Sequence, residues 1–278
     1  MKQLSLLLIF LCSGSSIAFG QDNTQKNTSK PFVLGAIEEI QSTVLSEKRI
    51  LNIYFPEGYQ ANDTTRYPVI YLLDGSADED FIHIAGLVQF SNFPWVNILP
   101  NSIVVGIANI DRRRDFTFPT TIEKDKKDFP TTGASAKFID FIEKELQPFI
   151  ETHYKTTKSK MIIGQSLGGL LATEILFKKA SLFTDYIIVS PSLWWDNESL
   201  LSEKNCSGLN IPESCSVYIG VGKEGPIMEN DARQLSGILT KNKNVKLSFE
   251  YFEKEDHASI LHQAVYNAFK ALKKTTKQ

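Results

Sequence analysis

Cysteine and histidine are scarce in this chain, with three cysteines and four histidines among 278 residues. No group of them has the spacing of metal ligands, and no glycine-rich loop has the pattern that binds phosphate. The sequence therefore predicts no metal and no other cofactor. The formal net charge is only −2, which gives no indication of nucleic acid or an anionic membrane as a partner.

Long apolar segments are also lacking, apart from one short run near the start. Lys2 precedes apolar residues 4–11, and the small residues Ala18 and Gly20 follow. This pattern is typical of a secretory signal peptide over residues 1–20, and the run is too short for a membrane anchor. We therefore expect an exported protein, periplasmic or extracellular, with no membrane anchor.

The rest of the chain reads as one domain. Residues 21–30 are polar and lack aromatic side chains, so we expect a disordered arm there. Residues 31–278 show no internal repeat and no linker, which predicts a single domain. Cys206 and Cys215 flank a short turn-rich segment, and in an oxidising compartment we expect a disulfide between them. Two unpaired thiols are the alternative, and the oligomeric state stays open.

Strand-like and helix-like segments alternate along this domain. Two alternating segments open it, at 32–45 and 49–55, and both are expected to be antiparallel edge strands. Further strands are expected at 67–73, 102–108, 185–189, 216–221 and 245–252, and helices at 78–90, 135–152, 226–240 and 259–272. Such alternation predicts an α/β fold with a doubly wound, mainly parallel sheet.

The segment Gly164-Gln165-Ser166-Leu167-Gly168 is the most informative in the chain. An apolar strand-like run precedes it, and residues 170–177 repeat apolar side chains at helical spacing. Strand, sharp turn and helix are the setting in which Gly-x-Ser-x-Gly forms a nucleophile elbow. The glycines let strand and helix approach closely while the serine takes a strained backbone conformation. We therefore predict Ser166 as a nucleophile.

A serine hydroxyl needs a base, and the base needs an acid that orients it. Where an elbow serine comes first, the acid and then the histidine follow along the chain. That order leaves His257 and His262. His257 follows a predicted strand directly, whereas His262 lies one turn into the next helix, so His257 is the predicted base.

The acid is expected after the strand at 216–221. Glu224 is the first carboxylate there, and Glu229 and Asp231 follow in a helix-like segment. Glu224 is the first choice for the acid, and the two later carboxylates remain alternatives.

Four segments resemble an esterase family of α/β-hydrolases. That family includes enterochelin and other siderophore esterases, S-formylglutathione hydrolase, feruloyl esterases and mycolyltransferases. The matching segments are Tyr67–Gly75, Val104–Asn109 with Arg114–Thr117, the elbow, and Ser190–Trp195. The resemblance implies the α/β-hydrolase fold and serine esterase activity. The arginine segment and the tryptophan pair look most like the periplasmic siderophore-hydrolase branch, in which a third catalytic residue contributes little.

The resemblance also implies the parts that meet the substrate. Backbone amides must stabilise the negative charge that develops on the ester carbonyl, and Leu167 should supply one of them. Gly75 or Ser76 should supply the second. Arg112 and Arg114 are candidates to bind an anionic substrate group, since arginine can hold one with two hydrogen bonds. Trp194 is a candidate for an apolar wall beside an aryl or acyl group.

The predicted function is a secreted serine esterase that cleaves a carboxylic ester through an acyl-enzyme. The expected substrate is a small-molecule or polysaccharide-linked ester, and a siderophore-type ester is the first choice. The alternatives are an esterase acting on feruloyl or acetyl groups of a polysaccharide, and a non-catalytic binding protein on a hydrolase scaffold.

Overall fold

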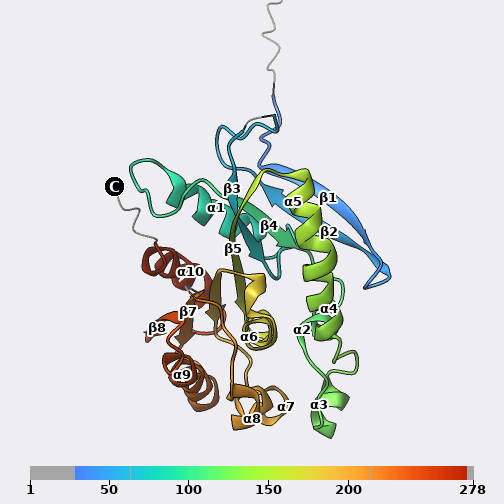
Figure 1. The fold of residues 1–278 in the computed structure, drawn as a ribbon, viewed down its shortest axis with the longest axis vertical. Coiled ribbons are helices and arrows are strands. Elements are labelled where there is room, and N and C mark those ends of the chain that lie inside the picture. Colours follow the sequence, from blue (N-terminus) through green and yellow to red (C-terminus); the bar gives the residue numbers. More distant parts are fainter. Residues whose placement is uncertain (1–28, 63, 214, 274–278) are drawn as a thin grey trace, which may run out of the picture. The chain divides into compact units, whose positions relative to one another are not determined.

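An eight-stranded sheet organises the chain from Leu34 onward (Figure 1). The computed structural model describes residues 29–62, 64–213 and 215–273. The predicted signal peptide, residues 1–20, and most of the predicted arm lie outside the described residues. The strands are β1 (Gly35–Ser42), β2 (Glu47–Tyr54), β3 (Tyr67–Leu72), β4 (Ile103–Ile107), β5 (Thr156–Gln165), β6 (Asp185–Val189), β7 (Cys215–Gly222) and β8 (Val245–Phe252).

The strands follow the order β1-β2-β4-β3-β5-β6-β7-β8. β1 pairs antiparallel with β2, and β2 pairs antiparallel with β4, while all other neighbours are parallel. β1 alternates between half-buried and exposed residues, as expected for a strand at the edge. The central strands β4 and β6 are buried throughout, because helices cover both faces of the sheet.

The helices divide between the two faces. They are α1 (Phe81–Asn92), α2 (Arg112–Phe116), α3 (Glu123–Asp128), α4 (Ser135–Phe141), η1 (Ile142–Leu146), α5 (Gln147–His153), α6 (Leu167–Lys178), η2 (Ala180–Leu182), α7 (Trp195–Glu198), η3 (Ser199–Leu201), α8 (Glu203–Cys206), α9 (Pro226–Thr240) and α10 (Ile260–Ala271). α1 and α10 pack against one core, and α4, α6 and α9 against the other. Neighbouring residues of one strand, such as Ile162 and Ile163 of β5, face opposite cores.

The predicted α/β-hydrolase fold is confirmed, with the antiparallel strands at the N-terminal edge. The segment at 112–116 is the short helix α2, whose first turn is capped by Asp111 accepting from the Arg114 amide at 3.0 Å. No helix of the described residues is long and apolar enough to span a membrane.

The predicted disulfide is not formed, and both cysteines are free. Cys206 ends α8, and its thiol lies 3.8 Å from the carbonyl oxygen of Leu200. Cys215 is buried at the start of β7, and burial raises the pKa of its thiol to about 12. The prediction was wrong because the turn-rich segment does not bring the two thiols together. One cysteine is held in α8 and the other in β7.

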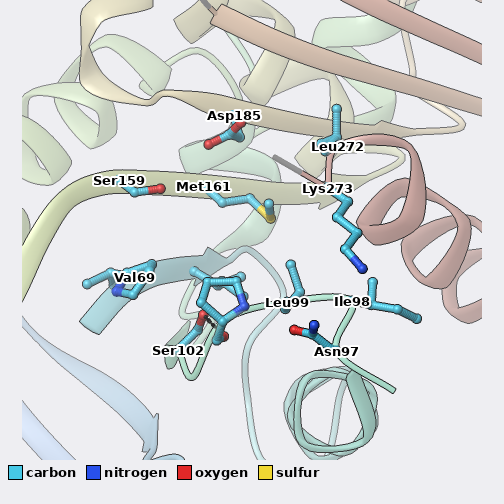
Figure 2. A pocket seen from close by; sticks show the side chains of 13 residues that line it. Val69, Asn97, Ile98, Leu99, Ser102, Ser159, Met161, Asp185, Leu272 and Lys273 are labelled. Atoms are coloured by element: carbon cyan, nitrogen blue, oxygen red, sulfur yellow. Dashed lines mark hydrogen bonds between the residues drawn. The ribbon is translucent and has the colours of Figure 1, made fainter. Parts of the chain in front are cut away.

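A cavity of about 350 Å³ lies where the parallel strands begin (Figure 2). Val69 of β3 and Met161 of β5 line it from the sheet, and Ile98, Leu99 and Leu272 line it from the surrounding segments. Its lining is mostly apolar, and Lys273 and Asp185 are the charged residues among the residues that form it.

Candidate active site

The loops after β3 to β8 meet at the opposite edge of the sheet, where the parallel strands end. Each carries a polar candidate, in chain order Asp74, Arg112, Ser166, Ser192, Glu224 and His257. The backbone at three of these strand ends takes positive φ values, at Asp74 (54°), Ser166 (59°) and Ser190 (42°). Strain of this kind concentrates at functional sites.

Ser166 lies in a nucleophile elbow between β5 and α6. Its φ of 59° and ψ of −119° are strained for a residue with a side chain. The flanking glycines are required sterically, because a Cβ on Gly164 would lie 2.4 Å from the carbonyl oxygen of Gly168. A Cβ on Gly169 would similarly lie 2.9 Å from Cα of Pro191. The elbow therefore holds Ser166 at the N-terminus of α6, clear of the sheet.

Glu224 and His257, predicted as acid and base, are in direct contact. Glu224 Oε2 lies 2.5 Å from His257 Nδ1. Its other oxygen accepts from the Ser190 hydroxyl and, at 3.0 Å, from the Gly222 amide. Burial favours a raised pKa for Glu224, but these hydrogen bonds outweigh burial and hold the pKa below its usual value. Glu224 is therefore ionised at neutral pH.

The contact with Glu224 fixes the roles of the imidazole nitrogens. With Nδ1 donating to the carboxylate, Nε2 of His257 is left as the proton acceptor. The backbone carbonyl of His257 accepts from Gln165 Nε2 at 2.5 Å, which ties the histidine loop to the elbow. Ser166 and His257 line the same two hollows.

Ser166 has a second hydroxyl beside it that sequence reasoning missed. Ser192 Oγ lies 3.2 Å from Ser166 Oγ, and the Ser192 amide donates to the Ser166 carbonyl at 3.0 Å. Ser192 is only 2% exposed. The sequence signal was present, since Ser192 follows β6 at the catalytic edge of the sheet, but a serine in that position has many ordinary roles.

The alternative acids and the second histidine lie elsewhere. Glu229 accepts from the amides of Glu224 and Gly225, so it caps the start of α9. Asp231 is buried on α9, and burial together with the charge of Glu198 raises its pKa to about 6. His262 stacks on His83 with ring centroids 5.1 Å apart.

The predicted oxyanion donors have different outcomes. Leu167 is the first residue of α6, so its N–H has no partner within the helix and Leu167 stays the predicted first donor. The Gly75 amide donates to the Ile107 carbonyl at 3.0 Å, so Gly75 is not available as a donor and that alternative was wrong. The Ser76 amide makes only a long contact of 3.4 Å to Glu79 Oε2. Ser76 therefore stays the predicted second donor.

The three consecutive arginines point in different directions. Arg112 forms a two-point pair with Asp74, at 2.6 and 2.9 Å, and its Nη2 also donates to the Gln165 carbonyl. Arg114 pairs with Glu47 at 2.6 Å and with Asp115 at 2.7 Å. Arg114 lines neither hollow at Ser166, so its predicted role in substrate binding is wrong. Its carboxylate partners draw it toward β2 instead.

Two hollows meet at Ser166 and His257 and differ in their lining. The Asp80 hollow, of about 420 Å³, adds Asp74, Glu79, Asp80, Arg112 and Gln165. The Trp194 hollow, of about 470 Å³, adds Ser192, Trp194, Lys223, Glu224, Met228, Asp256 and Ala258. Burial, followed by the charges of Asp74 and Glu79, raises the pKa of Asp80 to about 6 despite the opposing effect of Arg112.

Lys223 and Met228 were not predicted from the sequence. Lys223 sits in the acid-bearing loop, and Met228 in the first turn of α9. The sequence signal for both residues was that they follow the predicted strand at 216–221, at the edge of the sheet where the catalytic residues are expected. Among the residues that the structure describes, no group of three or more His, Cys, Asp or Glu side chains is arranged to hold a metal ion.

Comparison with known proteins agrees with this geometry. A family model described as "Putative esterase" matches residues 42–271. The ferri-bacillibactin esterase BesA of Bacillus subtilis is 29% identical over 273 residues, covering 90% of this chain and 93% of that protein. The structure of an IroE-like serine hydrolase from Shewanella oneidensis superposes with a TM-score of 0.80 at 30% identity, covering 86% of this chain and 80% of that one. The BES protein from Bacillus cereus gives 0.78 at 28% identity, covering 91% and 100%. The chain therefore belongs to this esterase family and is a serine hydrolase.

Proposed function

We propose that the protein hydrolyses a siderophore-type ester through an acyl-enzyme on Ser166, with His257 as base and Glu224 as the acid that orients it. The observation that carries the proposal is the contact of Glu224 with His257 Nδ1 at a sheet edge where both border the elbow serine. Relatives named as siderophore esterases support the substrate class.

The first half-reaction forms the acyl-enzyme. His257 Nε2 takes the proton of Ser166 Oγ as that oxygen attacks the ester carbonyl carbon. The Leu167 and Ser76 amides donate to the oxygen that becomes negative. When the intermediate collapses, the bond to the alcohol oxygen breaks and His257 returns its proton to the departing alcohol. Glu224 stays ionised and stabilises the imidazolium while it carries that proton.

The second half-reaction releases the acid. His257 Nε2 takes a proton from water, whose oxygen attacks the acyl carbon and forms a second tetrahedral intermediate. Its collapse breaks the bond to Ser166 Oγ, which recovers a proton from His257. We also propose export to the periplasm or the medium, on the strength of the signal-peptide pattern at residues 1–20.

The decisive experiment compares substrates on the wild type and on Ser166→Ala. We expect hydrolysis of a catecholate trilactone, with release of its linear products, to exceed release of acetyl or feruloyl groups from a sugar. Ser166→Ala should lower the trilactone rate by about 10⁴-fold or more, while circular dichroism stays unchanged. His257→Ala should be as damaging, and the double variant little worse than either, because the two residues act as one unit.

Two outcomes would contradict the proposal in different ways. Good release from a sugar ester without trilactone hydrolysis would move the substrate class to carbohydrate esters. Undiminished turnover by Ser166→Ala would rule out an acyl-enzyme on Ser166.

A further inference from the structure

The two hollows beside Ser166 differ in the number of their carboxylates and in whether their cation is already paired. The Asp80 hollow contains three carboxylates and one guanidinium, and that guanidinium is already paired with Asp74 through two hydrogen bonds. An anionic group placed there would face net negative charge. Repulsion between like charges therefore opposes an anionic substrate group on this side.

The Trp194 hollow contains a cation without a partner. Lys223 lines it, and its ammonium makes no ion pair or hydrogen bond with any described residue. The Lys223 backbone is fixed, since its amide donates to the Glu255 carbonyl at 2.7 Å. The side chain thus starts from a fixed point at the rim of the hollow and has its charge free for a substrate.

The same hollow also contains two carboxylates, Glu224 and Asp256, and both are held by partners other than Lys223. Glu224 is bound to His257, Ser190 and the Gly222 amide. Asp256 accepts from the amides of Ala258 and Ser259 at the start of α10, which lowers its pKa. Neither carboxylate forms an ion pair with Lys223.

The walls of this hollow suit a flat apolar group. Trp194 is half-buried and lines this hollow together with Ser166. Met228 lies in the first turn of α9 and also lines the hollow. Its thioether can make favourable contacts with an aromatic ring. An aromatic ring between them would bury apolar surface while its charged substituent reaches Lys223.

We propose that the Trp194 hollow binds an anionic aromatic group of the ester, with Lys223 as its cation and Trp194 and Met228 as its walls. The Asp80 hollow has three carboxylates and its arginine is already paired, so it disfavours that group, and the scissile bond then meets Ser166 in one orientation. This inference rests on the proposed esterase function and adds the residues that select the substrate. Lys223, rather than the predicted Arg112 and Arg114, then supplies the positive charge that binds the anionic group.

The test uses simple phenyl esters, so it does not depend on a siderophore. One pair, 4-carboxyphenyl acetate and 4-methylphenyl acetate, varies charge on the leaving group. The other, phenyl hydrogen succinate and phenyl butyrate, varies charge on the acyl group. The variants are Lys223→Met, Lys223→Arg and, as a matched control, Lys254→Met, an exposed lysine that lines neither hollow.

We expect Lys223→Met to raise KM for at least one anionic ester about tenfold while both neutral esters change less than twofold. Lys223→Arg should restore KM, and Lys254→Met should leave it unchanged. The difference between wild type and Lys223→Met should shrink at high salt, because the contact is electrostatic and partly exposed. The pair that responds identifies whether the hollow takes the acyl or the alcohol side.

An equal effect of Lys223→Met on charged and neutral esters, or no effect on either, would overturn the inference. Trp194→Leu gives an independent check, since it should raise KM for the anionic phenyl ester more than for an anionic alkyl ester. Failure to hydrolyse a trilactone would count against the proposed substrate only, because the phenyl esters report on Lys223 regardless. Trilactone hydrolysis that is indifferent to Lys223 would count against this inference only.

Discussion

The two ends of the parallel strands form cavities of opposite character. Where the strands begin, a cavity of about 350 Å³ is lined mainly by aliphatic side chains (Figure 2). Where they end, two hollows meet at Ser166 and His257 and are lined by charged and polar groups. Cavity volume alone does not separate the two ends. The chemistry lies at the end where loops converge on a nucleophile and a base, as in other open α/β sheets.

Positive φ values gather at the catalytic end. Asp74, Ser166 and Ser190 have positive φ and lie within two residues of strand ends there, whereas Asn97 is a positive-φ residue that lines the opposite cavity. Keeping such conformations requires support, and the neighbouring glycines and hydrogen bonds supply it. Three of the loops that meet at Ser166 thus keep a strained backbone conformation, whereas the lining of the opposite cavity is mostly apolar.

The largest effect after loss of Ser166 or His257 is expected from Glu224→Gln. The amide cannot stabilise the imidazolium, so kcat should fall by about 10²–10⁴. Because the pKa of Glu224 is lowered in the fold, its contribution to wild-type stability is present at neutral pH and is lost as pH falls through that lowered pKa. Steady-state kinetics on a phenyl ester checks the rate.

Glu229→Gln and Asp231→Asn serve as the controls for Glu224→Gln. Both should keep kcat within about threefold, since one residue caps α9 and the other is buried on it away from His257. A large loss in either would reassign the acid. Normal kcat in all three variants would indicate a serine–histidine pair without a third residue.

A smaller effect is expected from Ser192→Ala. The buried Ser192 hydroxyl lies 3.2 Å from Ser166 Oγ. In the proposed mechanism the Ser166 proton goes to His257, so we expect Ser192 to be the donor of this pair and to hold Ser166 Oγ in place. Its loss should lower kcat about tenfold with little change in KM, which is the split expected for a group acting on the reacting atom. The exposed Ser207→Ala is the control. A change in KM alone would assign Ser192 to substrate binding instead.

Sequence reasoning succeeded where the signal is local and failed where a distant partner decides. The glycines of the elbow and the chain order of serine, acid and histidine pointed to the three residues that the structure brings to one edge. Gly75 failed as an oxyanion donor because its amide is used by Ile107 on a neighbouring strand. The prediction that Arg114 binds substrate failed because successive residues of a helix point about 100° apart, so Arg112 and Arg114 cannot face the same way. Arg114 pairs with Glu47 and Asp115 instead.

The parallel sheet was predictable because its strands alternate with helices, and the antiparallel edge because its first two strands alternate in polarity. The pairing of β2 with β4 rather than β3 was not predictable, because buried strands of similar composition are interchangeable by pattern. Lys223 and Met228 were not predictable for another reason, because their proposed role depends on lining the same hollow as Trp194, which comes from a distant part of the chain.

The smallest effect on catalysis should come from the opposite end of the sheet, and a pair of methionines tests it. Met161 lines the cavity at the start of the strands and is 8% exposed, whereas Met228 lines the Trp194 hollow. Met161→Ala removes buried apolar contacts, so the free energy of unfolding should fall by about 2 kcal/mol, the low end for such changes because a cavity already exists there. Its kcat and KM should match the wild type, although Met161 lies on the strand that leads to Ser166.

Met228→Ala should do the reverse, raising KM for an aryl ester severalfold with a smaller loss of stability. Urea unfolding and ester kinetics on both variants measure the two effects, and a loss of kcat in Met161→Ala would mean that the two ends of β5 are mechanically coupled.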